Sequence, residues 1–240
     1  MRDYISQSQI TLFRDCDYKY AMRYKYNKES IIWDPTIMDV GRYVHDACDD
    51  YYKKYWDPTR TEEEILYYSY ECLKKRWDRW LKPELLLKAY KCMEGFAKFE
   101  IKNINNGIVT QPETEMTIEV DGLLGIIDYM NVYPDRIRAV EYKTGAKPTL
   151  GFYNKLQAVM YRRLIEKKYG IKIKEFEFEF PLPNETRIVK FDNKTDKVEK
   201  EMDDLINRIR KAWKKDVFVK KPRTPSGCKW CEYKYYCGGI

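Results

Sequence analysis

Hydrophobic residues recur along the chain with two different periods, and the change of period divides the sequence into two parts. In the first part the apolar positions have helical spacing. This spacing predicts helices over about 8–24 and 37–56, and a longer helical stretch over 61–104 that is interrupted at Pro83. After Gly107 apolar and polar residues alternate, which predicts strands. The pattern therefore indicates an α/β protein with a helical insertion at 57–105 ahead of its sheet.

The second part is predicted to mix strands with helices. The clearest strand is 171–180, where apolar and charged residues alternate almost perfectly. The expected elements, in chain order, are strand 113–120 with a turn at Asp121-Gly122, a hairpin at 125–143, helix 152–169 ended by Gly170, strand 171–180 with its partner 186–191, and helix 198–213.

The hairpin at 125–143 has a register that can be counted from its turn. Pro134 and Asp135 suit the two loop residues, because proline presets the backbone angle and Asp favours bends. Counting back from this turn places Asp128 directly opposite Glu141.

Three charged side chains then share one face of the hairpin, because side chains alternate between faces along a strand. They are Asp128, Glu141 and Lys143. Two carboxylates are suitable oxygen ligands for a hard divalent cation, and the lysine can orient water or stabilise charge on a phosphate. The alternative interpretation is a surface ladder of ion pairs.

Composition and charge narrow the class of protein. The 240 residues are 44% hydrophobic and 35% charged, which is typical of a folded chain, and the first residues show no apolar signal region, so we expect a cytoplasmic protein without a membrane segment. The net charge of +7 hints at a polyanionic partner. Several of the 22 tyrosines alternate with Lys or Arg, which suits stacking on bases but equally suits solvated helix surfaces.

Seven cysteines in a reducing compartment suggest metal or redox chemistry rather than disulfides. Three of them, Cys228, Cys231 and Cys237, lie close together near the end of the chain and need a fourth ligand. Cys16 is the candidate. Zinc and an iron–sulfur cluster are both possible for such a set. The remaining three lie in predicted helices, where we expect small buried side chains: Cys48, Cys72 and Cys92.

The segment ending at Asp128, together with Glu141-Tyr142-Lys143, resembles motifs II and III of the PD-(D/E)xK nucleases, and most closely the branch of RecB, AddB and the CRISPR-associated exonuclease (the fourth Cas protein). Ile127 stands where the motif's proline would be. The resemblance implies a restriction-endonuclease-like mixed sheet flanked by helices. It also implies that Asp128 and Glu141 bind Mg or Mn and that Lys143 serves catalysis.

Two further elements gain roles from this resemblance. Gly41-Arg-Tyr-Val-His45 is similar to a helical element whose histidine ligates the catalytic metal, and the carbonyl of Tyr142 is a further possible ligand. Gln157 and Tyr161 share one helix face and resemble a pair that faces the scissile strand. Without the resemblance, His45 would be read as a half-buried residue and the pair as the polar edge of a helix.

In the same branch, an N-terminal cysteine and three C-terminal cysteines hold a 4Fe–4S cluster. The resemblance therefore implies that Cys16, Cys228, Cys231 and Cys237 bind such a cluster, which joins the chain ends like a staple. We expect a single nuclease domain over 1–240, with the catalytic sheet and helix at 113–191 and the cysteine cluster within 220–240.

The resemblance implies metal-dependent hydrolysis of DNA, on single strands or ends. Three hypotheses follow from it. The chain is a free-standing exonuclease in recombination, repair or replication, or a CRISPR adaptation nuclease that trims prespacers with an integrase partner, or a DNA-binding scaffold with a vestigial site. The scaffold hypothesis predicts broken motifs, and none is broken here.

Overall fold

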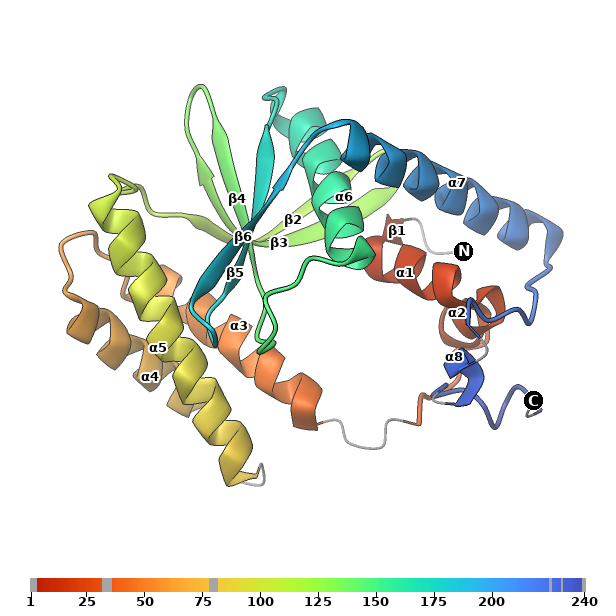
Figure 1. Ribbon diagram of the computed structural model, residues 1–240, viewed down its shortest axis with the longest axis horizontal. Helices are drawn as coiled ribbons and strands as arrows, with labels where there is room; N and C mark the ends of the chain where they lie inside the picture. The colour runs from red at the N-terminus through yellow and green to blue at the C-terminus, as the bar shows by residue number, and fades with distance from the viewer. Residues whose placement is uncertain (1–3, 32–35, 78–81, 225, 230, 239–240) are drawn as a thin grey trace.

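A single mixed sheet forms the centre of the molecule in this computed structural model, which describes residues 4–31, 36–77, 82–224, 226–229 and 231–238 (Figure 1). Its order is β1-β3-β4-β5-β6, and β2 pairs with β3. The strands are β1 (Ile5–Ser6), β2 (Glu113–Val120), β3 (Leu123–Val132), β4 (Ile137–Tyr142), β5 (Glu175–Phe180) and β6 (Glu185–Lys190).

The two edges of β3 are used differently. One edge pairs with antiparallel β2 along most of its length. The other edge pairs with parallel β1 at Leu123 and Leu124, and then with antiparallel β4 from Tyr129 onward. Between Leu124 and Tyr129 this edge passes from one neighbour to the other. Asp128 lies at that fork.

Helices cover both faces of the sheet, so the strands are buried between two apolar cores. The described helices are α1 (Gln7–Asp15), α2 (Asp17–Tyr24), α3 (Thr36–Lys54), α4 (Glu62–Arg76), α5 (Pro83–Asn105), α6 (Phe152–Tyr169), α7 (Asn193–Lys215) and the short α8 (Ser226–Lys229), which lies beside the chain ends and not on the sheet (Figure 1). On β4, Ala139 enters the core beneath α1, α6 and α7, whereas its neighbour Val140 enters the core beneath α3, α4 and α5. This arrangement confirms the predicted mixed sheet flanked by helices.

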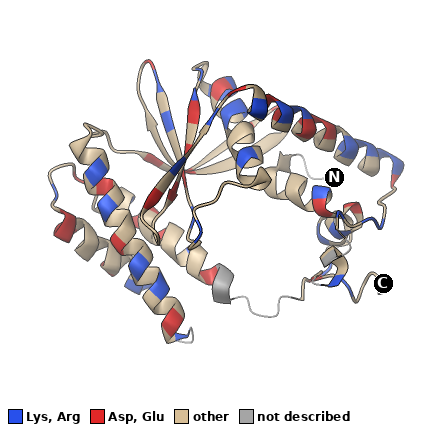
Figure 2. Ribbon diagram, in the orientation of Figure 1, with Lys and Arg blue, Asp and Glu red and all other residues tan. Residues whose placement is uncertain are grey.

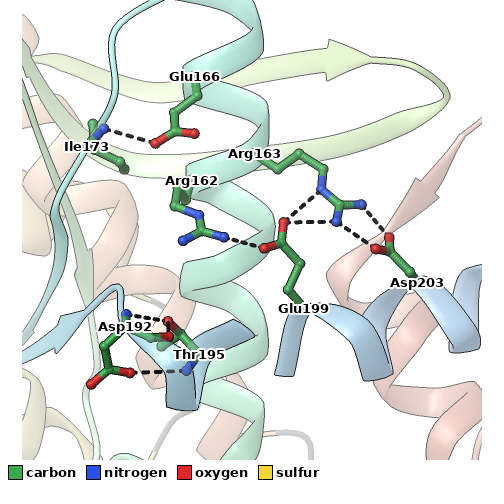
Figure 3. A network of polar contacts seen from close by, with 8 residues as sticks. All are labelled: Arg162, Arg163, Glu166, Ile173, Asp192, Thr195, Glu199 and Asp203. Atoms are coloured by element: carbon green, nitrogen blue, oxygen red, sulfur yellow. Dashed lines mark hydrogen bonds and ion pairs between the residues drawn. The ribbon is translucent and has the colours of Figure 1, made fainter. Parts of the chain in front are cut away.

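Local sequence signals explain most of the element boundaries. Thr61 and Glu64 form a capping box at the start of α4, and Asp192 and Thr195 do the same for α7 (Figure 3). Gly170 ends α6 in the left-handed conformation, as its place after the periodic stretch predicts.

Ion pairs clamp α7 onto α6, and Figure 3 shows how they connect. Arg163 makes two contacts with Asp203, at 2.6 and 3.0 Å, and two with Glu199, at 2.9 and 3.3 Å. Arg162 also contacts Glu199. A shared, bidentate network of this kind stabilises a surface more than separate pairs do.

The structure corrects three predicted boundaries. The helix expected over 8–24 breaks at Cys16, whose backbone is extended, and neither glycine nor proline marks the break. The strand expected over 171–180 begins only at Glu175, where its pairing with Lys190 of β6 begins. The helix expected over 198–213 begins at Asn193, because the cap at Asp192 lies ahead of the apolar positions.

The proposed insertion at 57–105 contributes α4 and α5, which pack on α3 and share its apolar core. Residues 78–81 of this stretch lie outside the described residues, and its role as a separate insertion stays a prediction. In the described part of the chain, no helix has the length and apolar character needed to span a bilayer.

Gly95 allows α5 to approach the turn after β5. A methyl group at this position would lie 1.8 Å from the carbonyl oxygen of Pro181. We expect Gly95→Ala to lower the free energy of unfolding by about 1–3 kcal/mol, because overpacking outweighs the better helix propensity of alanine. Urea unfolding measures the change. Gly145→Ala is the matched control, since a methyl group there meets no atom within 4 Å. Equal midpoints for both variants would contradict this packing argument.

Candidate active site

Asp128 and Glu141 lie side by side on β3 and β4. Tyr129 pairs with Val140, and in this register the next residues toward the fork, Asp128 and Glu141, are opposite each other. The predicted turn sets this register. The backbone N–H of Tyr133 donates to the backbone carbonyl of Arg136 at 2.9 Å, which closes the turn over residues 134 and 135.

His45 reaches Asp128 from the helical layer. It lies on α3, and its Nδ1 is 3.2 Å from Asp128 Oδ1. One turn earlier, a methyl group on Gly41 would come within 3.4 Å of Thr144 Oγ1, so the helix passes close to the end of β4. Burial alone would lower the pKa of His45. The negative charges of Asp128 and of nearby glutamates outweigh burial and raise the pKa to about 9.

Glu115 is a candidate ligand that the sequence interpretation missed. Thr114 pairs with Tyr129 across β2 and β3, so Glu115 lies opposite Asp128 on the other side from Glu141. Within the described chain, His45, Glu115 and Asp128 form the group of three potential ligands whose atoms all lie within 4.8 Å of one another. Counting back from the Asp121-Gly122 turn would have revealed this residue.

The backbone at Glu115 is unusual. Its φ of 48° is in the left-handed region, which costs a non-glycine residue about 1–3 kcal/mol. Removal from water, followed by repulsion from Asp128, raises the pKa of its carboxyl group to about 7. Strained backbone and crowded negative charge at one point are typical of a binding site rather than of a structural ion pair.

Glu141 belongs to a second group, which contains the lysine. Its Oε1 accepts from Lys143 Nζ at 3.0 Å and from Gln157 Nε2 at 2.7 Å. Lys143 Nζ also donates to Gln157 Oε1 at 2.9 Å, and Gln157 Nε2 lies 3.2 Å from Tyr161 Oη. The helix face predicted to hold Gln157 and Tyr161 therefore fixes the direction of the lysine.

The other oxygen of Glu141 has no partner among the described residues. Oε2 is buried and makes no hydrogen bond, although Glu141 is only 6% exposed. Burial and then the charge of Asp128 raise the pKa of Glu141 to about 7, against the opposing effects of Lys143 and His45. An unpaired buried carboxylate oxygen is costly, and a divalent cation would satisfy it.

Tyr142 connects the two groups. Its backbone N–H donates to Asp128 Oδ2 at 2.7 Å, so only Oδ1 of that carboxylate faces His45. Its buried side chain points to the other face of the sheet, where its hydroxyl lies 2.8 Å from that of Tyr52. Tyr52 in turn donates to Glu100. This buried chain of hydrogen bonds fixes the backbone between Glu141 and Lys143. The Tyr142 carbonyl as a metal ligand stays a prediction.

Taken together, these side chains fit a divalent cation beside a fixed ammonium group. His45, Glu115 and Asp128 provide nitrogen and oxygen ligands. The predicted ligand Glu141 lies outside this group of three, on the neighbouring strand, and offers a further oxygen. Such a centre, with a lysine at its edge, can polarise a phosphate and orient a water molecule.

Four cysteines lie around one cavity at the other end of the molecule. Cys16, Cys228, Cys231 and Cys237 all line a cavity of about 690 Å³. Backbone hydrogen bonds join the two chain ends here, from Tyr18 to Val219 and from Arg223 to Asp15. Cys48, Cys72 and Cys92 are buried in the helical layer, as predicted. Residues 225, 230 and 239–240 of the predicted 220–240 segment lie outside the described residues.

Comparison with known proteins shows the family. The sequence model of the PD-(D/E)XK nuclease superfamily matches residues 4–238. The chain belongs to this superfamily. No curated protein matches the chain. The PD-(D/E)XK nucleases use divalent metals, which agrees with the group formed by His45, Glu115 and Asp128.

Solved structures support the fold. A candidate exonuclease from Eubacterium rectale shares 16% identity with this PD-(D/E)XK nuclease at a TM-score of 0.58, over 98% of this chain and 88% of that chain. The crystal structure of SSO0001 shares 12% identity at a TM-score of 0.43, over 99% of this chain and 87% of that chain, which is too distant to support an argument.

Metal binding is expected to strengthen steeply with pH. His45, with its pKa near 9, and Glu115 and Glu141, with pKa values near 7, hold protons that a cation must displace. Affinity for Mn²⁺ should therefore rise about tenfold or more per pH unit between about pH 6 and 8. Calorimetry in two buffers of different ionisation enthalpy measures both affinity and proton release.

Two variants make this measurement specific. His45→Gln should weaken Mn²⁺ binding and reduce the number of protons released. Glu119→Gln removes an exposed carboxylate from the same strand as Glu115 and should change neither quantity. Binding that is independent of pH would show that these groups do not hold the metal.

Proposed function

We propose that this nuclease is a metal-dependent DNA exonuclease that acts on single strands or DNA ends. The observation that carries the proposal is the buried, unpartnered oxygen of Glu141, a residue that lies opposite Asp128 and whose other oxygen accepts from Lys143. The candidate exonuclease from Eubacterium rectale, of the same fold, is consistent with exonuclease activity.

In the proposed mechanism, His45, Glu115, Asp128 and Glu141 hold Mn²⁺ or Mg²⁺. The bound cation would polarise a phosphoryl oxygen and lower the pKa of a bound water. Lys143 places a positive charge beside the carboxylates, where it can donate to the attacking water or to the phosphate oxygen that gains negative charge.

The remaining residues of the proposed site position these groups. Gln157 holds Lys143 and Glu141 at once, so the ammonium group has one direction. Tyr161 contacts Gln157 and lines an adjacent cavity of about 390 Å³, where it can contact the substrate strand. Correctly held groups reduce the barrier because little reorganisation is needed during the reaction.

The four-cysteine cavity supports a 4Fe–4S cluster as structural cofactor, and with it the RecB/AddB-like branch. Tetrahedral zinc with Zn–S bonds of about 2.3 Å requires sulfur atoms about 3.8 Å apart. No three of the described cysteines have sulfur atoms within 4.8 Å of one another. A 4Fe–4S cluster, in which each cysteine binds a different iron, suits the wider arrangement better.

The pathway has two candidates within this proposal. In one, the protein is a free-standing exonuclease. In the other, it trims prespacers together with a CRISPR integrase, because the branch with four cysteines includes a CRISPR-associated exonuclease. The genes encoded beside this one distinguish them. A DNA-binding scaffold with a vestigial site is disfavoured, because the chain retains His45, Asp128, Glu141 and Lys143.

Lys143→Ala should lower cleavage of single-stranded DNA by a factor of about 10²–10⁴, because the charge that stabilises the phosphate is removed. Degradation of an end-labelled oligonucleotide in Mn²⁺ measures the rate. Lys172→Ala, which removes an exposed lysine between α6 and β5, is the control and should leave the rate unchanged. If Lys143→Ala cleaves as fast as the wild type, the catalytic assignment is wrong.

Protein purified without oxygen should carry about four iron atoms per chain and absorb broadly at about 400 nm. Cys228→Ala should lose both the iron and the absorbance, since one ligand of the cluster is missing. Cys72→Ala changes a buried thiol in the helical layer and should keep both. Stoichiometric zinc without the absorbance would refute the cluster.

A further inference from the structure

The exposed apolar side chains gather in one part of the molecule. We define the terminal lobe as residues 16–31, 217–224, 226–229 and 231–237, which contribute most of the lining of the cysteine cavity. Eleven large apolar side chains are exposed in the described chain, and the terminal lobe contains six of them: Tyr26, Ile31, Val217, Val219, Tyr235 and Tyr236. Tyr235 is 63% exposed. This concentration indicates a binding surface.

The same lobe carries most of the net charge. Its 35 residues include nine Lys or Arg and three Asp or Glu, a net charge of +6, whereas the whole chain has +7. Figure 2 shows Lys and Arg recurring on α2 and on the segments beside α8. Two of the three acids already have partners, since Glu232 pairs with Lys19 at 2.9 Å and Asp17 with Arg208 at 3.5 Å.

Exposed rings and cations are neighbours on this surface. The ammonium nitrogen of Lys234 lies 5.2 Å from the ring centre of Tyr235, and that of Lys28 lies 5.5 Å from the ring centre of Tyr236. The second pair joins the two segments of the lobe. Each site thus offers a π-face and a positive charge within about one nucleotide of each other.

The rings project from an ordered framework. Tyr233, two residues before Tyr235, is only 2% exposed. The backbone N–H of Cys237 donates to the backbone carbonyl of Tyr233. The backbone N–H of Ile31 donates to the carbonyl of Glu232, which fixes the two segments together. A fixed backbone beneath the rings reduces the conformational freedom that is lost when a ligand stacks on them.

One cavity is lined both by the lobe and by β3, the strand that carries Asp128. Its volume is about 390 Å³, and Arg23 and Tyr24 of the lobe contribute to its lining. Gly125 and Ile126 of β3, close before Asp128, line it as well, together with Tyr161. Ile126 is 44% exposed. A DNA strand that lies on the lobe can therefore reach Ile126, two residues before Asp128 on β3.

We propose that the terminal lobe is a binding surface for single-stranded DNA, which delivers the strand to the active site. This inference rests on the proposed function. The charge suits a polyanion, and the exposed rings suit unstacked bases. A duplex keeps its bases stacked inside, so it offers these rings no partner.

The test is fluorescence anisotropy with a fluorescein-labelled oligothymidylate of about 20 nucleotides, in EDTA so that the strand stays intact. Tyr235→Ser/Tyr236→Ser should raise the dissociation constant about tenfold or more, because the variant cannot stack on two bases. Tyr67→Ser is the matched control, since Tyr67 is 61% exposed on α4 and should leave affinity unchanged. Tyr235→Phe/Tyr236→Phe keeps the rings and should retain the affinity.

A salt series tests the charges separately. Lys28→Gln/Lys221→Gln should reduce the slope of log affinity against log salt by about 1.4, because each phosphate of a single strand that is no longer neutralised reduces it by about 0.7. Lys194→Gln/Lys197→Gln removes the same charge from the exposed start of α7 and should not change the slope.

Two outcomes would overturn the proposal. One is an unchanged affinity of the tyrosine-to-serine variant for the oligonucleotide. The other is a loss of that variant's binding to phosphatidylserine-containing vesicles while DNA binding persists, which would assign the surface to a membrane. Failure of the proposed function is a different result, because there the wild type would hydrolyse no DNA in Mn²⁺ whatever its affinity.

Discussion

The proposed site depends on the register of β3 with its two antiparallel neighbours. Asp121-Gly122 sets the pairing with β2, and the turn before Arg136 sets the pairing with β4. Together they place Glu115, Asp128 and Glu141 in one row across three strands. A slip of one residue on either side would turn a carboxylate to the opposite face of the sheet. Two tight turns therefore determine which oxygen atoms meet, while the fork where β1 gives way to β4 leaves room beside Asp128 for a helix to deliver His45.

A row of three carboxylates opposes folding, and the structure shows how this cost is met. Protons are retained, since the pKa values of Glu115 and Glu141 are raised to about 7 and that of His45 to about 9. Lys143 neutralises part of the remaining charge. For Glu115 and Glu141, whose folded pKa is above the unfolded value, stability contributed by these protons is present at low pH and is lost as pH rises toward 7. A divalent cation replaces the protons, so the same features that burden the metal-free protein favour metal binding.

Local signals made much of the fold predictable, whereas contacts distant in sequence did not. The bounds of α6 and the register at Asp128 follow from glycine, proline and alternation, which act over a few residues. The break at Cys16 has no such signal, because contacts with the C-terminal segment accompany it. Glu115 is predictable in principle, because counting the strand pairing back from Asp121-Gly122 places it opposite Asp128. The proximity of His45 to Asp128 required the path of α3 across the fork, which periodicity cannot supply.

Charge is distributed differently around the proposed active site and in the terminal lobe. Near Asp128 the carboxylates repel a phosphate until a cation is bound, so the site itself provides little attraction for a polyanion. The terminal lobe has +6 and exposed rings, and it attracts a strand independently of the metal. Because this attraction releases counterions, it weakens with salt, whereas the buried contacts of Lys143 and Glu141 are screened far less. In this proposal, capture of the strand and hydrolysis of the phosphodiester bond therefore depend on different physical interactions. The contacts between the two chain ends keep the terminal lobe in place relative to the sheet.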